Sequence, residues 1–179
     1  MSSSKKKITR WIENVIIKQN ICPFAKRPYE SGQILLQESN AAQIDQIIMD
    51  FSIALEKVST SKEQNSALIF YPKLKCSFEY FNDLKGECDQ IIEDLNFHHD
   101  YQLVCFHSNF KFIDTHTDDR VNYVNRSPYP LLHILGFSEV EKVMQKYESI
   151  GLDINKINER YLNSLTDDEF NNLILKYLN

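Results

Sequence analysis

The feature that most constrains the fold is an alternation of short apolar stretches with longer stretches of helical periodicity. Ser66 to Tyr71 is a continuous apolar run, as is typical of a buried strand. Strand-like stretches also cover Gly32 to Glu38 and Tyr101 to His107. Between them, apolar residues recur at helical spacing over residues 44–58 and again over about 78–95. The order along the chain is therefore strand, helix, strand, helix, strand.

This order predicts an α/β fold with a small, largely parallel three-stranded sheet (β-α-β-α-β) that is covered by helices. Strands separated by helices favour right-handed crossovers, which place neighbouring strands parallel. An amphipathic helix is expected before the first strand, because apolar residues recur there at helical spacing. Its stripe consists of Ile8, Trp11, Ile12, Val15 and Ile16.

After the third strand we expect only helices, including a C-terminal helical tail. Pro130 suits the first turn of a short helix that contains His133. Capping boxes at 138–141 and 166–169 each precede a helical apolar pattern. The stripe over 170–178 is expected to dock the C-terminus onto the body of the protein.

Length and composition predict an ordinary globular protein with one domain, residues 1–179. The net charge of -5 argues against nucleic-acid binding. The four cysteines form no C-x-x-C pair, and no apolar run approaches the length of a membrane span or resembles a signal peptide. A cytoplasmic, reducing setting is therefore expected. With four glycines and no phosphate-cradling loop, no nucleotide is expected.

The stretch from Cys105 to His133, which we call the central stretch, is the candidate site. It contains no glycine, but it is rich in His, Asp, Asn and Arg. A long connection with such residues is uncommon in a compact domain unless it has a function.

Three segments resemble a known family. They are I-C-P-F-A at 21–25, Y-Q-L-V-C-F-H at 101–107, and D-D-R-V-N-Y-V-N-R-S-P-Y-P-L-L-H-I-L at 118–135. Together they resemble the bacterial domain of unknown function 1415, and the resemblance covers nearly the whole chain. This chain departs from the family pattern at Ser108, where the family has proline, and at Gly136 and Phe137, where the family has Arg-Glu. The resemblance implies no established activity or cofactor.

Cys22 is a candidate nucleophile or ligand if its thiol lies near the free N–H groups of a following helical turn. It could equally lie at the C-terminal end of the first helix, where the dipole disfavours a thiolate, or be a small buried hydrophobe. His107, His133 and Asp119 are the other catalytic candidates. Cys22, His107 and His133 are also candidate ligands for a divalent metal such as zinc or iron. Alternatively, both histidines donate structural hydrogen bonds.

Arg126 is a candidate receptor for an anionic substrate, because a guanidinium group beside free backbone N–H groups suits a carboxylate or phosphate. In the alternative, Arg126 pairs with Asp118 or Asp119 and holds the loop together. The expected substrate-binding set is Asn122, Asn125, Arg126, Ser127 and Tyr129.

The sequence therefore supports three functional hypotheses. The first is an enzyme of small-molecule metabolism that acts on a small anionic molecule at a Cys/His/Asp/Arg site. The second is a non-catalytic binding or adaptor protein. The third is a metal or cofactor carrier.

Overall fold

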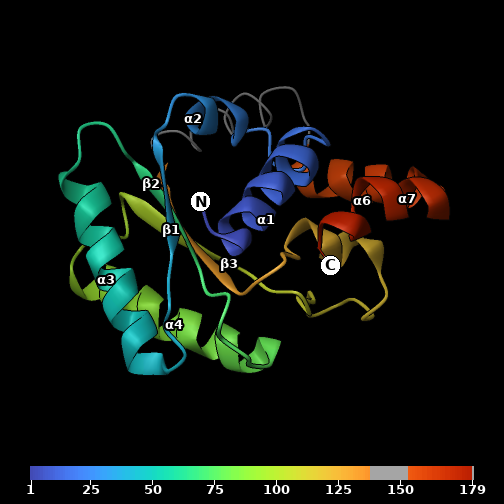
Figure 1. Ribbon diagram of the computed structural model, residues 1–179. Helices are drawn as coiled ribbons and strands as arrows, with labels where there is room; N and C mark the ends of the chain where they lie inside the picture. Colours follow the sequence, from blue (N-terminus) through green and yellow to red (C-terminus); the bar gives the residue numbers. More distant parts are fainter. Residues whose placement is uncertain (138–152, 179) are drawn as a thin grey trace.

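A computed structural model describes residues 1–137 and 153–178. It shows a mixed α/β fold around one four-stranded sheet of order β1-β2-β4-β3 (Figure 1). The strands are β1 (Ile34–Glu38), β2 (Ser66–Phe70), β3 (Tyr101–Phe106) and β4 (Leu131–Gly136). Only β1 and β2 pair in parallel, whereas β4 pairs antiparallel with both β2 and β3.

The expected α/β class is confirmed, but the expected three-stranded, largely parallel sheet is wrong. The expected short helix around His133 is also wrong, because this residue lies in β4. Leu131 to Leu135 is a short apolar run that follows a proline, and such a run suits a strand with neighbours on both sides. His133 is opposite Leu68 of β2 and Val104 of β3.

Helices α3 (Ile44–Thr60) and α4 (Phe78–Asp94) cover one face of the sheet (Figure 1). Both helices were expected from the sequence. They bury Phe51, Leu55, Phe81 and Leu84 against strand residues such as Ile69, and we call this group the α3/α4 core. Burial of such side chains supplies most of the driving force for folding.

The opposite face is covered by α1 (Ser3–Trp11), which continues into a π-helix, η1 (Ile12–Ile17), and by the C-terminal helices. All five residues of the predicted N-terminal stripe are buried there. The expected helix is thus confirmed to Ile17, although its second half has the wider π geometry. A short helix, α2 (Lys26–Glu30), follows.

The C-terminal segment contains α6 (Ile154–Ser164), α7 (Asp167–Leu173) and the 3-10 helix η3 (Leu175–Tyr177). The capping box of Thr166 and Glu169 is confirmed at the start of α7. Phe170 and Ile174 are buried against the α1 side of the sheet, so the docking of the C-terminus is also confirmed. The capping box expected at 138–141 lies outside the described residues.

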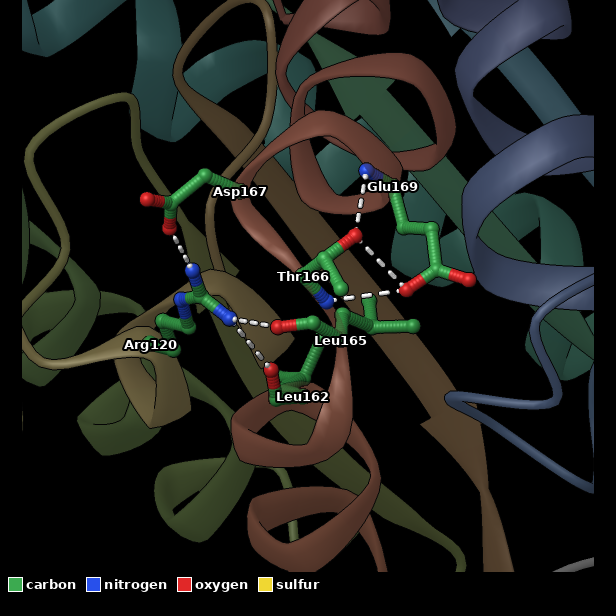
Figure 2. A network of polar contacts seen from close by, with 6 residues as sticks. All are labelled: Arg120, Leu162, Leu165, Thr166, Asp167 and Glu169. Atoms are coloured by element: carbon green, nitrogen blue, oxygen red, sulfur yellow. Dashed lines mark hydrogen bonds and ion pairs between the residues drawn. The ribbon is translucent and has the colours of Figure 1, made fainter.

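Arg120 links these C-terminal helices to the 3-10 helix η2 (Arg120–Val124) (Figure 2). Its Nη1 donates to the carbonyl oxygens of Leu162, at 3.2 Å, and Leu165, at 2.5 Å. Its Nη2 lies 2.5 Å from Oδ1 of Asp167. One guanidinium group therefore joins the central stretch to both α6 and α7.

No helix within residues 1–137 and 153–178 combines the length and the apolar character needed to cross a bilayer.

Candidate functional site

A cavity of about 550 Å³ lies between the sheet and the segment that runs from α1 to α2. Its walls are mainly aliphatic and aromatic side chains. The helical side contributes Trp11, Ile12 and Ile16, and the sheet contributes Leu68, Val104 and Leu135.

The alternation of side chains along the strands explains which residues reach the cavity. In β2, Ser66 and Leu68 face it, whereas Ala67 and Ile69 face the α3/α4 core. In β4, His133 and Leu135 face the cavity, while Leu132 and Ile134 point the other way and complete that core.

His133 and Ser66 form a polar pair in this largely apolar wall. Nε2 of His133 lies 2.7 Å from the hydroxyl oxygen of Ser66. His133 is partly exposed and lines the cavity. Loss of hydration lowers the pKa of His133 to about 4. The imidazole is therefore neutral at pH 7.

Cys22 lies on the same cavity, in a turn between η1 and α2. Its N–H donates to the carbonyl oxygen of Ile16 at 3.3 Å, and its carbonyl oxygen accepts from Ala25 at 3.1 Å. Burial raises the pKa of the Cys22 thiol, although hydrogen bonds from the backbone of Phe24 and Ala25 oppose the rise. The thiol is thus protonated at neutral pH.

Asn158 and Asn125 are also polar residues of the lining, together with Asn65, Gln102, Asp153 and Asn155. Nδ2 of the buried Asn158 donates to the carbonyl oxygen of Ile21 at 2.8 Å, so α6 holds the segment that carries Cys22. The carbonyl oxygen of Asn125 accepts from the N–H of His107 at 3.2 Å.

His107 does not line the cavity. It follows β3 on the face covered by α4, and its ring centroid lies 6.1 Å from that of Phe78 and 6.0 Å from that of Phe81. Its Nδ1 accepts from the N–H of Asn109 at 3.1 Å. Burial lowers the pKa of His107. These contacts are structural, as in the alternative for this residue, but the hydrogen bond with Asn109 is accepted and not donated by the ring.

Asp119 and Asn122 hold the central stretch in its conformation. Oδ2 of Asp119 accepts from the N–H of His116 at 2.7 Å. Asn122 is fully buried, its Oδ1 accepts from the N–H of Phe112 at 3.0 Å, and its Nδ2 donates to the carbonyl oxygen of His116 at 2.7 Å. Such side-chain bonds replace the backbone pairing that an irregular segment lacks.

Arg126 is buried and bonds to the same stretch. Its Nε donates to the carbonyl oxygen of Phe110 at 3.2 Å, and its Nη2 donates to that of Thr117 at 2.6 Å. Its guanidinium carbon lies 4.2 Å from the ring centroid of Tyr123. The group therefore stabilises the loop, as in the alternative reading, but through carbonyl oxygens and an aromatic face instead of Asp118 or Asp119.

The remaining predicted substrate-binding residues also have local partners. The hydroxyl of Ser127 donates to the carbonyl oxygen of Tyr129 at 2.5 Å. The Tyr129 ring stacks on Phe70, with a centroid separation of 6.3 Å, and Nζ of Lys7 lies 5.3 Å from its centroid. Neither residue lines the cavity.

Of the predicted site residues, the structure thus brings Cys22, Asn125 and His133 together. His107 lies on the other face of the sheet, so the three expected metal ligands do not meet. Within the part of the chain that the structure describes, no three His, Cys, Asp or Glu side chains form a group that could hold a metal ion.

Among the cavity residues that were not expected from the sequence are Trp11, Ser66 and Asn158. Trp11 was expected only as a core residue, and nothing marks Asn158 in the sequence. A signal for Ser66 exists, because it is the only hydroxyl residue within the apolar run at 66–70.

The comparisons with known proteins agree with the resemblance seen in the sequence. No curated protein and no solved structure matches the chain significantly. A family model described as "Protein of unknown function (DUF1415)" matches residues 3–172 of the 179. A match over nearly the full length, which includes the cavity wall and the central stretch, means that this chain belongs to the DUF1415 family.

Proposed function

We propose that this protein binds a small, predominantly apolar molecule in the cavity between the sheet and η1. The observation that carries the proposal is the cavity itself. Its volume of about 550 Å³ falls within the range of small-molecule sites. Apolar walls with a few polar groups are typical of such sites, because the walls supply affinity and the polar groups orient the ligand.

Binding is better supported than catalysis at a Cys/His/Asp/Arg site. A nucleophilic cysteine is normally activated by a lowered pKa, whereas burial raises the pKa of Cys22. His107, Asp119 and Arg126 lie outside the cavity and have structural partners. The anionic substrate expected at Arg126 therefore has less support than a ligand in the cavity.

The proposal can be tested with N-phenyl-1-naphthylamine, a neutral probe whose fluorescence rises in apolar surroundings. We expect saturable binding to the purified protein. Trp11 is the only tryptophan of the chain and lines the cavity, so its emission should change in the same titration.

A pair of variants locates the binding. Val104→Phe adds volume to a lining residue and should weaken probe binding at least tenfold, or about 1.4 kcal/mol. Ile53→Phe makes a similar change at an exposed position of α3, across the sheet, and should leave binding unchanged. Equal binding by both variants, with circular dichroism showing that they fold, would disprove the proposal.

A further inference from the structure

We infer that the ligand of this cavity is an uncharged molecule with an apolar body and one oxygen function, and that this oxygen function hydrogen-bonds to Nδ1 of His133. The inference rests on the proposed function and adds the chemical class of the ligand and its anchor.

The two ring nitrogens of His133 differ in their hydrogen-bond partners. Nε2 is bonded to the Ser66 hydroxyl at 2.7 Å. Nδ1 has no hydrogen-bond partner among the described residues. His133 lines the cavity and is partly exposed, so this second nitrogen is assigned to a molecule inside the cavity.

Nδ1 of His133 can donate or accept a hydrogen bond, depending on the tautomer of the ring. If the Ser66 hydroxyl donates to Nε2, then Nδ1 carries the proton and donates to the ligand. If Nε2 donates to Ser66, then Nδ1 accepts. Both tautomers keep the bond to Ser66, so the pair suits a carbonyl oxygen as well as a hydroxyl group.

The charges of the described lining weigh against a negatively charged ligand. No Lys or Arg side chain is among the described lining residues, and the one charged side chain there is the carboxylate of Asp153. His133 cannot supply a positive charge at pH 7, because burial keeps its pKa low. An anion would lose its hydration without gaining a cationic partner, and this is costly.

A positively charged ligand is also poorly matched. Oδ1 of Asp153 already accepts from the N–H groups of Asn155, at 2.9 Å, and Lys156, at 3.3 Å, as the N-cap of α6. Its Oδ2 lies 3.9 Å from Nζ of Lys156. The carboxylate is therefore already partnered at the start of the helix.

Three compounds of one shape test the inference by displacement of N-phenyl-1-naphthylamine at pH 7.5. 2-Acetonaphthone is a neutral ketone, 2-isopropenylnaphthalene is its hydrocarbon counterpart, and 2-naphthoate is its anionic counterpart. We expect the ketone to bind at least 100-fold more tightly than 2-naphthoate. Equal affinity of these two compounds would overturn the inference and needs no variant to interpret.

The anchor is tested by the ratio of ketone to hydrocarbon affinity. His133→Leu should lower this ratio at least tenfold, and His133→Gln should restore part of it, because an amide again offers a donor and an acceptor. In the wild-type protein, the ¹⁵N resonance of His133 Nδ1 should shift with the ketone and not with the hydrocarbon. A shift of equal size with both compounds would refute the anchor.

The outcomes separate the two proposals. If no compound displaces the probe and Val104→Phe binds it as the wild type does, the cavity is not a binding site and the proposed function fails. If all three compounds bind in the cavity with a ratio that His133→Leu leaves unchanged, binding stands and only the inferred ligand class and anchor fail.

Discussion

His133 and Arg126 are both polar side chains in apolar surroundings, but their hydrogen-bonding capacity is used differently. Arg126 donates hydrogen bonds to the carbonyl oxygens of Phe110 and Thr117, within its own loop. His133 lines the cavity and bonds to Ser66 through one of its two nitrogens. A group that bonds within its own loop stabilises the fold, whereas a partly engaged group in a cavity is available for recognition.

The lowered pKa of His133 makes stability depend on pH. Its pKa is about 4 in the folded chain against the ordinary histidine value of about 6.5, so the unfolded chain binds the proton more readily. The contribution is complete above about pH 6.5 and is lost as the pH falls toward about 4. We expect the free energy of unfolding, measured by urea denaturation, to fall by about 2 kcal/mol between pH 7.5 and pH 5 because of His133.

His133→Gln removes the titrating group and should reduce that pH dependence by a similar amount. His116→Gln is the matched control, because His116 lies exposed in the central stretch. An identical pH dependence in the wild type and His133→Gln would contradict the expectation.

Arg126→Met keeps most of the side-chain length but removes every donor. The carbonyl oxygens of Phe110 and Thr117 then lose their partner, and we expect the unfolding free energy to fall by about 2 to 3 kcal/mol. Urea denaturation measures this change. A loss of less than about 0.5 kcal/mol, the range of ordinary surface substitutions, would show that the loop does not depend on Arg126.

For individual residues, the sequence identified the cluster of polar side chains in the central stretch, but it did not show whether their roles are functional or structural. The central stretch was expected to hold a site, but several of its polar side chains, including Asp119 and Asn122, instead bond to backbone atoms of the same stretch. The reason is physical, because a long irregular segment without glycine must satisfy its backbone groups with side chains. Partners of this kind cannot be read from residue type alone.

Strand β4 shows how an element can be misread from sequence. A five-residue run after a proline, with four apolar residues and one histidine, is compatible with a helix or a buried strand, and periodicity does not separate the two. Length favours the strand, since helices usually need more residues. Because β4 lies between β2 and β3, missing this one strand also led to the prediction of a largely parallel sheet in place of the mixed sheet that is observed.

Two glycines make a matched pair at the scale of elements. A Cβ at Gly136, the last residue of β4, would lie 2.7 Å from the carbonyl oxygen of Asn65, so Gly136→Ala should destabilise the fold by about 1 to 3 kcal/mol. Gly86, inside α4, has open space, so Gly86→Ala should stabilise by about 1 kcal/mol. Thermal unfolding compares them, and shifts of the same sign would contradict this reading.

The attachment of α6 and α7 depends more on carbonyl bonds than on the ion pair in Figure 2. Asp167 is highly exposed, and such pairs contribute little, so Asp167→Asn should cost less than about 0.5 kcal/mol. Arg120→Met also removes the donors to Leu162 and Leu165 and should cost about 1 to 2 kcal/mol. Urea denaturation gives both values, and equal costs would show that the ion pair dominates.

At the scale of the whole molecule, one sheet separates two groups of buried side chains. The α3/α4 core lies on one face, and Trp11 belongs to the group on the other face. The positions of α1, α3 and α4 were predictable because their apolar stripes are long and regular. The order of the strands was not, because pairing depends on contacts between segments far apart in the chain.

The expectation of a single domain, residues 1–179, leads to a prediction about cooperativity. Leu84→Ala opens a space in the α3/α4 core and should cost about 2 to 4 kcal/mol. In a single cooperative unit, Trp11 fluorescence on the other face should shift its urea midpoint as far as far-ultraviolet circular dichroism does. A Trp11 transition that stays at the wild-type midpoint would indicate two independently unfolding units.

The central position of β4 also has a consequence for biosynthesis. Strands β2 and β3 emerge from the ribosome before their shared neighbour, which is complete only at Gly136. Until then, each has an edge with unpaired backbone groups, and open edges of this kind are prone to pair with other chains. The nascent chain therefore passes through a stage in which β1, β2 and β3 have all been made and the sheet is still divided in two.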